Sequence, residues 1–134
     1  MGWAFNDFGW LPAVDGKAGR TLWYLSEETG YSQLYALDTT GGRPKALTSG
    51  RWEASQPELS ADGNRFYFLC NRKWPGDYEV CAVEAGGGDV RELTSLDGVE
   101  DFSVSPEGRQ LLVRYSGSYL PPQLAVVGTD GGAA

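Results

Sequence analysis

A repeat of 45 to 47 residues constrains this chain more than any other feature. Residues 60–69 read SADGNRFYFL and return as SPEGRQLLVR at residues 105–114, which is 45 positions later. An earlier copy, DGKAGRTLWY at residues 15–24, places its Asp-Gly pair 47 positions before the Asp-Gly pair of the second copy. Repetition at this period indicates a fold built from like units that stack on one another.

A second sequence element repeats in phase with the first. QLYALD at residues 33–38 leads through a Gly-Gly pair to Leu-Thr at residues 47–48, and EVCAVE at residues 79–84 leads through another Gly-Gly pair to Leu-Thr at residues 93–94. The third copy reaches QLAVV at residues 123–127 and stops before a closing Leu-Thr. The chain therefore holds three copies, of which the last is incomplete.

Each unit predicts four short strands and no helix. The first strand, at residues 56–60 or 101–105, ends at an Asp/Glu-Gly turn, where glycine accommodates the positive φ. The second, at residues 65–70 or 110–115, is aromatic and aliphatic, which is typical of a strand buried on both faces. The third, such as residues 78–84, meets a Gly-Gly turn and then a short fourth strand ending at Leu-Thr. No window shows a helical period.

Four antiparallel strands in a unit of this length are typical of a β-propeller blade. We therefore predict an all-β partial propeller of four-stranded antiparallel blades, with blades over residues 1–55, 56–100 and 101–134 and the last one incomplete. A propeller has about 4 to 8 blades, so three units indicate a segment of a larger propeller or a chain that must associate to cover open blade faces. A compact β-sandwich of about eleven strands is the alternative, but it does not explain the period.

The absence of histidine excludes several kinds of catalytic site. Among 134 residues there is no imidazole for a Ser-His-Asp or Cys-His arrangement or for an HExxH zinc site. Ser116 and Ser118 lack a neighbouring base, and the aspartates do not follow a calcium-loop spacing. The sequence thus predicts no catalytic residue, no cofactor and no metal site in this chain.

The charge balance argues against two classes of partner. Eleven Lys and Arg stand against 18 Asp and Glu, a net charge of −7, and the basic residues form no run. Nucleic acid and anionic membranes both attract clustered positive charge, so neither is expected as a partner. No stretch is apolar enough to span a membrane, and the first residues lack the pattern of a signal peptide, which leaves the localisation open.

The two cysteines, Cys70 and Cys81, are too few for a disulfide scaffold and have no metal-ligand partners at a suitable spacing. They could face each other across neighbouring strands of one hairpin. Because a disulfide demands specific geometry, the sequence favours two small buried hydrophobic side chains over a bridge.

Several motifs carry a family resemblance that covers nearly the whole chain. They are YLSEETGYSQLY at residues 24–35, LTSGRWE at 47–53, FLCNR at 68–72 with PGDYEV at 75–80, and LVRYSGSYLPPQL at 112–124. In this order they resemble the N-terminal β-propeller of dipeptidyl peptidase IV-like members of the prolyl oligopeptidase family, a family of serine peptidases. One repeat alone is less specific, because TolB-like propellers share it. The order of the motifs favours the peptidase family.

The resemblance implies a role inside a larger enzyme. In that family the propeller precedes an α/β-hydrolase domain that holds the catalytic serine, aspartate and histidine, and it restricts which peptides reach them. This chain would then be a non-catalytic segment of such a propeller, with the hydrolase domain of the parent chain and its peptide substrates as partners. The chain departs from the family pattern in having no histidine and no Gly-x-Ser-x-Gly nucleophile elbow, so we expect no hydrolysis by this chain alone.

Four residues are candidates for substrate binding: Glu27, Glu28, Arg51 and Trp52. The resemblance implies that a Glu-Glu pair can hold the free amino terminus of a peptide through charge-assisted hydrogen bonds, but Glu27 and Glu28 lie between two strands of an ordinary repeat, which favours a solvated turn. Arg51 and Trp52 fall on the connection between two blades, where packing is the commoner use of a tryptophan than lining a channel. Residues 71–77 are predicted as a longer solvated loop that could touch a partner domain.

Two other functions remain open at this point. One is a TolB-like propeller that acts as a protein-binding scaffold with no peptidase attached. The other is self-association, in which copies of this chain complete a ring because blades are stabilised by their neighbours. The sequence that follows Ala134 in the parent reading frame would discriminate the peptidase from the scaffold.

Overall fold

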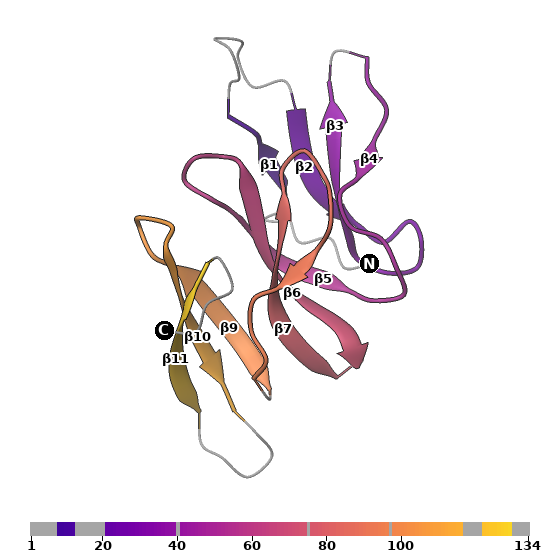
Figure 1. The fold of residues 1–134 in the computed structure, drawn as a ribbon. Coiled ribbons are helices and arrows are strands. Elements are labelled where there is room, and N and C mark those ends of the chain that lie inside the picture. Colours follow the sequence, from indigo (N-terminus) through magenta and orange to yellow (C-terminus); the bar gives the residue numbers. More distant parts are fainter. Residues whose placement is uncertain are drawn as a thin grey trace.

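The computed structural model describes residues 8–12, 21–39, 41–74, 76–96, 98–116 and 122–129. Within these residues the secondary structure is all strand, in three antiparallel sheets that follow one another in space (Figure 1). There is accordingly no helix in this part of the chain that could cross a membrane. We name the sheets blade 1, blade 2 and blade 3 in chain order.

Blades 1 and 2 have four strands each, in sequential order. Blade 1 consists of β1 (Phe8–Trp10), β2 (Thr21–Ser26), β3 (Gln33–Asp38) and β4 (Lys45–Ala46). Blade 2 consists of β5 (Ala54–Leu59), β6 (Arg65–Trp74), β7 (Asp77–Glu84) and β8 (Arg91–Glu92). The short β4 and β8 precede Leu-Thr directly, where the repeat predicts a fourth strand.

Blade 3 has three described strands, β9 (Val99–Val104), β10 (Gln110–Tyr115) and β11 (Gln123–Gly128). The order is β9, β10, β11, and all pairs are antiparallel. Among the described residues this blade lacks the fourth strand, as the incomplete third copy of the repeat predicts.

The turns after the first strands of blades 2 and 3 confirm the prediction from the Asp/Glu-Gly pairs. Gly63 and Gly108 have φ angles of 76° and 74°, and their amides donate to the carbonyls of Ser60 and Ser105 at 2.9 and 2.8 Å. A side chain at such a φ is strained, which explains the glycine. The Asp15-Gly16 copy of this turn lies outside the described residues.

Two expectations from the sequence are corrected. One concerns the limits of a strand, and the other concerns the burial of a strand. Of the loop expected at residues 71–77, residues 71–74 are strand, because β6 continues to Trp74 and pairs with Asp77 of β7 after a register shift, so the hairpin extends beyond the sheet core. The strand at 110–115 is not buried on both faces either, since its residues alternate between exposed and buried. No described blade covers the second face of β10. Residues 66–70 of β6, in contrast, lie between two blades and are buried throughout.

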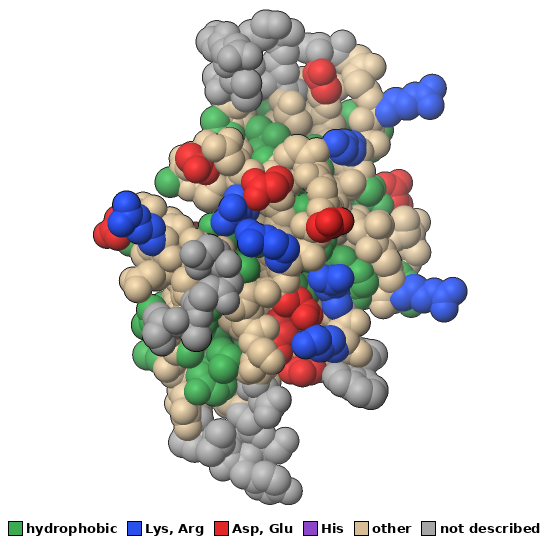
Figure 2. Space-filling model, viewed as in Figure 1, with side chains coloured by type: hydrophobic (Ala, Val, Ile, Leu, Met, Phe, Trp, Pro, Cys, Tyr) green, Lys and Arg blue, Asp and Glu red, His purple; other side chains and the backbone are tan. Residues whose placement is uncertain are grey.

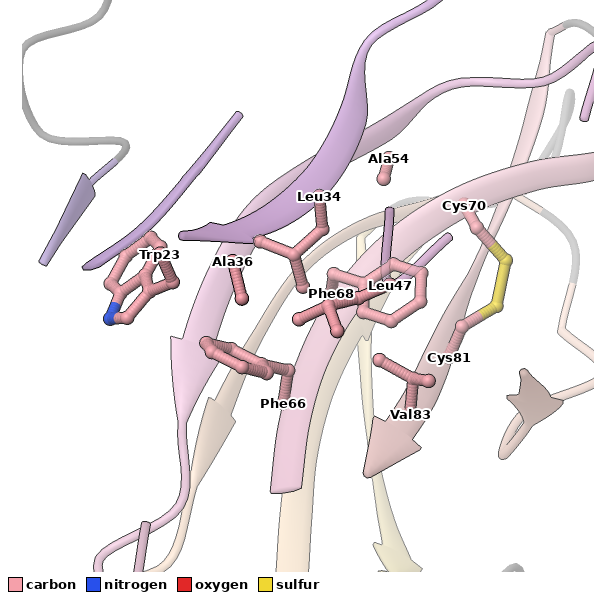
Figure 3. Close-up of a cluster of buried hydrophobic side chains, with 10 residues drawn as sticks. All are labelled: Trp23, Leu34, Ala36, Leu47, Ala54, Phe66, Phe68, Cys70, Cys81 and Val83. Atoms are coloured by element: carbon pink, nitrogen blue, oxygen red, sulfur yellow. A yellow bond between two sulfur atoms is a disulfide. The ribbon is translucent and has the colours of Figure 1, made fainter. Parts of the chain in front are cut away.

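The hydrophobic core consists of two clusters, one at each junction between blades. At the first junction, Trp23 of blade 1 meets Phe66 of blade 2 edge to face, with ring centroids 5.5 Å apart (Figure 3). The cluster contains Trp23, Leu34, Ala36, Leu47, Ala54, Phe66, Phe68, Cys70, Cys81 and Val83. The second junction joins blades 2 and 3 through Tyr67, Leu69, Val80, Ala82, Leu93, Val99, Leu111, Val113 and Val127.

Each blade therefore has two distinct faces. We call the face turned toward the following blade the front face and the opposite one the back face. In blade 1 the front face carries Trp23 and Leu34, and in blade 2 it carries Tyr67 and Val80, each packed on the next blade. Gly9 lies beside Trp23, where an added Cβ would come within 2.9 Å of the indole ring, so only glycine fits at this position of β1.

The expectation of two unpaired cysteines is wrong. Cys70 and Cys81 form a disulfide with their Cα atoms 6.1 Å apart (Figure 3). In the register of β6 and β7, Cys70 lies opposite Glu79 and Cys81 lies opposite Phe68, so the two cysteines are diagonal neighbours on one face. This pairing depends on the register of the two strands, which the spacing of the cysteines does not reveal.

Candidate functional site

Two segments meet at one end of blade 1 and enclose a cavity of about 290 Å³. One is the β2–β3 loop at residues 27–32, and the other is the connection from β4 to β5 at residues 47–53. Tyr35 and Ala46, which are cross-strand partners, place the cavity on the back face of blade 1. The cavity is lined by Thr29, Tyr31, Gln33, Tyr35, Ala46, Thr48, Ser49, Gly50 and Arg51.

A buried glutamine fixes the shape of the β4–β5 connection. The Gln33 side chain is 1% exposed, and its amide nitrogen donates to the carbonyls of Gly50 and Trp52 at 3.0 and 2.6 Å. Its carbonyl oxygen accepts a hydrogen bond of 2.5 Å from the Thr48 hydroxyl, which in turn accepts from the Leu34 amide at 2.9 Å. These bonds hold the backbone that carries Arg51 and Trp52.

Of the four sequence candidates, Arg51 lines the cavity. Arg51 is exposed, so its guanidinium is accessible from solvent. Burial raises the pKa of the Tyr35 phenol, and the charge of the Glu28 carboxylate raises that pKa further. The cavity therefore has a cationic side chain at one wall and a phenol at another.

Glu27 and Glu28 lie on an exposed turn, as the sequence favours. The Gly30 amide donates to the Glu27 carbonyl at 2.8 Å, and the Glu28 amide donates to the Ser26 hydroxyl at 3.3 Å. Neither glutamate lines the cavity. The two carboxylates thus belong to one exposed turn outside the cavity walls.

Trp52 points the other way, toward blade 2. Its ring stacks on Phe68 with centroids 6.3 Å apart and planes inclined by 11°, and the Arg72 guanidinium lies 5.8 Å from the Trp52 ring centroid. Arg72 also donates to the Val90 carbonyl at 3.1 Å. Trp52 therefore packs between neighbouring blades, and its role in substrate binding stays a prediction.

The surface charge is spread rather than concentrated. Figure 2 shows Lys and Arg side chains lying among Asp and Glu side chains on the visible face. The described ion pairs, such as Arg65 with Glu84 at 3.2 Å, join exposed or partly exposed groups. Such pairs contribute little to the stability of the fold, so these charged side chains mainly keep this face hydrated.

Sequence reasoning missed the buried polar residue at the start of the third strand of each complete unit. Glu79 in blade 2 takes the place of Gln33: it is 6% exposed, and its carboxylate accepts from the Thr94 hydroxyl at 2.5 Å and from the Leu96 amide at 3.0 Å. The available signal was the recurrence of a Gln or Glu fifteen residues before the threonine of Leu-Thr in both units.

The protonation of Glu79 should make stability depend on pH. Burial raises the pKa of Glu79 above 4.5, and the charges of Asp77 and Glu92 raise it as well, against the hydrogen bonds from Thr94 and Leu96. The folded protein thus binds this proton more tightly than the unfolded chain does. Its contribution to stability is fully present below about pH 4.5 and is lost as the pH rises through the folded pKa.

We predict that Glu79→Gln, which reproduces Gln33, raises the free energy of unfolding at neutral pH and leaves it unchanged at acid pH. Within the titration window the difference from the wild type should grow by up to about 1.4 kcal/mol per pH unit. Denaturant unfolding from acid to neutral pH measures it, with the exposed Glu107→Gln as control. Parallel curves for wild type and Glu79→Gln would contradict the prediction.

One group of potential metal ligands occurs among the described residues: Cys70, Cys81 and Glu92. Because the two sulfur atoms are bonded to each other, neither is a thiolate available to a cation. A single carboxylate remains, which is too few ligands for a site. The oxidised protein therefore offers no metal centre at this position.

Comparison with known families adds an independent finding. The family model described as the dipeptidyl peptidase IV (DPP IV) N-terminal region matches residues 2–122. Dipeptidyl aminopeptidase B of Saccharomyces cerevisiae is 34% identical over 103 residues, which cover 72% of this chain and 13% of the yeast protein. The chain thus spans a small part of the length of this relative.

Solved structures agree on the fold. Dipeptidyl peptidase 4 of Porphyromonas gingivalis superimposes with a TM-score of 0.74 at 22% identity, over 95% of this chain and 17% of that one. TolB of Acinetobacter baumannii gives a TM-score of 0.60 at 21% identity, over 85% of this chain and 28% of that one. At these identities the likeness concerns the fold alone, and it supports a partial propeller of antiparallel blades.

Proposed function

Because the chain belongs to the family of dipeptidyl peptidase IV N-terminal regions, we propose that it is a non-catalytic segment of the propeller of a dipeptidyl peptidase-like serine peptidase. In this role the blades restrict the access of peptides to a separate α/β-hydrolase domain. The observation that carries the proposal is the family match over residues 2–122, which extends across all three blades.

The chemistry of the side chains supports a role without catalysis. A serine nucleophile needs an adjacent base, and the 134 residues contain no histidine. The Ser116 hydroxyl contacts the Glu100 carboxylate at 3.3 Å, where both groups lie on the surface. Bond cleavage is therefore assigned to the hydrolase domain of the parent chain.

The cavity at the end of blade 1 is the part of this segment best suited to meet a peptide. Arg51 offers an exposed guanidinium, which binds carbonyl and carboxylate oxygens well. Tyr31 and Tyr35 supply apolar ring surface beside it. We propose that a peptide passing this end of the propeller contacts Arg51, while the Gln33 hydrogen bonds hold the connection in place.

The test uses the full-length protein encoded by the gene that contains this segment. We expect Arg51→Ala to raise KM for an Xaa-Pro chromogenic substrate by about two- to fivefold with kcat unchanged, the effect of losing one partly exposed charged contact. Arg43→Ala, which removes an exposed arginine from the β3–β4 turn, is the matched control and should leave KM unchanged. Glu27→Gln should also have no effect.

Three results would overturn parts of the proposal. Hydrolysis of the same substrate by the purified 134-residue chain would show that the segment is catalytic after all. Equal KM values for Arg51→Ala and Arg43→Ala would remove Arg51 from the access route while leaving the family assignment intact. A parent reading frame without an α/β-hydrolase domain would favour the scaffold alternative.

A further inference from the structure

Three side chains with metal-binding atoms gather in blade 2, on the side that packs against blade 1. They are Cys70 of β6, Cys81 of β7 and Glu92 of β8, and their sulfur and carboxylate oxygen atoms all lie within 4.8 Å of one another. In the oxidised protein the bond between the two sulfur atoms closes this group to a cation (Figure 3). We propose that reduction of the bridge opens a binding site for a thiophilic divalent cation such as zinc.

The register of blade 2 places the three side chains on one face of the sheet. Cys81 is the cross-strand partner of Glu92, so these two side chains extend to the same side. Cys70 lies opposite Glu79, two residues before Cys81 along β7, and is therefore a diagonal neighbour of Cys81 on that side. The Cα atoms of the two cysteines are 6.1 Å apart. Three paired strands thus hold the ligand-bearing positions together without help from the S–S bond.

The step that creates the ligands is a two-electron reduction. A dithiol reductant passes two electrons to the S–S bond and becomes a disulfide, while its two protons end on Cys70 and Cys81 as thiols. Zinc then displaces both thiol protons to solvent and forms two Zn–S bonds. Bonds of about 2.3 Å hold two sulfur atoms of a tetrahedral site about 3.8 Å apart. The sulfur atoms therefore need to separate only to ordinary non-bonded contact.

The donor set selects the kind of ion. Two thiolates are soft ligands that favour zinc, whereas calcium and magnesium require oxygen ligands. Cys70 and Cys81 are both fully buried, so their sulfur atoms lie out of water. The Glu92 carboxylate is the third ligand, and its side chain is 20% exposed on β8, the last strand in the order of this sheet. An ion enters from this side, and water completes the tetrahedron as the fourth ligand.

The balance of charge also favours a divalent cation at this position. Two thiolates and one carboxylate carry three negative charges, and the Lys73 ammonium lies 3.5 Å from the Glu92 carboxylate. A divalent ion brings the group, with Lys73, to a net charge of zero. Without an ion, two buried thiolates would leave negative charge uncompensated, which is costly away from water.

Zinc titration of the 134-residue chain tests the site. The chain has no histidine and no third cysteine, so no other thiolate or imidazole competes for zinc. The bridge is reduced with a trialkylphosphine, which takes oxygen from water to become the phosphine oxide and competes for zinc less than a dithiol does. Competition with a chromophoric chelator gives the affinity, and circular dichroism establishes that the protein is folded. We expect one zinc ion per reduced chain and none on the oxidised chain.

Glu92→Gln distinguishes a three-ligand site from a simple pair of thiols. It keeps both cysteines and the size of the side chain but removes the carboxylate, so it should weaken zinc binding by at least about tenfold. Glu84→Gln is the matched control, because Glu84 also lies in blade 2 and pairs with a cation, Arg65 at 3.2 Å, but does not belong to the cluster. It should bind zinc as the wild type does. Zinc should also raise the melting temperature of the reduced wild type.

The inference fails on any of three results. One is equal zinc binding, or none, before and after reduction. Another is equal affinity in Glu92→Gln and the wild type, which would mean that two thiols bind the ion without the third strand. The last is a reduced chain that unfolds and stays unfolded when zinc is added, because the site requires the register of β6, β7 and β8. The inference concerns this cluster alone and does not depend on the peptidase assignment.

Discussion

Phe68→Ala is expected to lower the free energy of unfolding by about 3–5 kcal/mol. The Phe68 ring is fully buried between blades 1 and 2, and it stacks on Trp52. Its removal leaves a cavity at the junction that carries the β4–β5 connection. Because small domains are stabilised by only about 5–15 kcal/mol, the loss is a large share of the whole.

Phe8→Ala is the matched control for this prediction. It deletes the same atoms from a side chain that is 53% exposed, and it should change stability by about 0.5 kcal/mol or less. Denaturant unfolding of dilute protein measures both variants. Equal effects at the two positions would show that the junction between blades 1 and 2 does not contribute to cooperative folding.

Reduction of the Cys70–Cys81 disulfide is the second large effect. The bridge closes a loop with a sequence separation of 11 residues, and constraining such a loop in the unfolded chain is worth about 2–3 kcal/mol. Unfolding with and without a thiol reductant should show this loss in the wild type. The double variant Cys70→Ala with Cys81→Ala should not respond to the reductant.

Mass spectrometry after alkylation provides the direct check. Alkylated in denaturant, where both residues are accessible, the protein without reductant should take up no label at either cysteine, and the reduced protein should take up two. Two labelled thiols in protein prepared without reductant would contradict the bridge and restore the interpretation of two small buried hydrophobic side chains. The same result would also make both sulfur atoms available beside Glu92.

The repeat predicted the strands and turns because these depend on local sequence. The strand at residues 110–115 and the glycine turns at Gly63 and Gly108 occur where the motifs place them. Burial on both faces depends instead on a neighbouring blade. The prediction is therefore right for residues 66–70 of the strand predicted at 65–70 and wrong for residues 110–115, although the two sequences have a similar apolar content.

The candidate site was predicted in part. The position of Glu27 and Glu28 on an exposed turn, and that of Trp52 between blades, follow from their places in the repeat. The effect of the Glu28 charge on the pKa of Tyr35 does not follow from it, and neither does the role of Gln33 in shaping the connection. These contacts join segments whose relative positions the local pattern does not specify.

By itself, the sequence determined the period of the blades, the order of the strands, the glycine turns and the family. Each of these is encoded in short-range patterns of apolar, polar and glycine residues. The tertiary structure alone decided the pairing of Cys70 with Cys81 and the burial of Gln33 and Glu79. These features depend on strand register and on which faces meet, because contacts between residues far apart in the chain form only when the blades pack together.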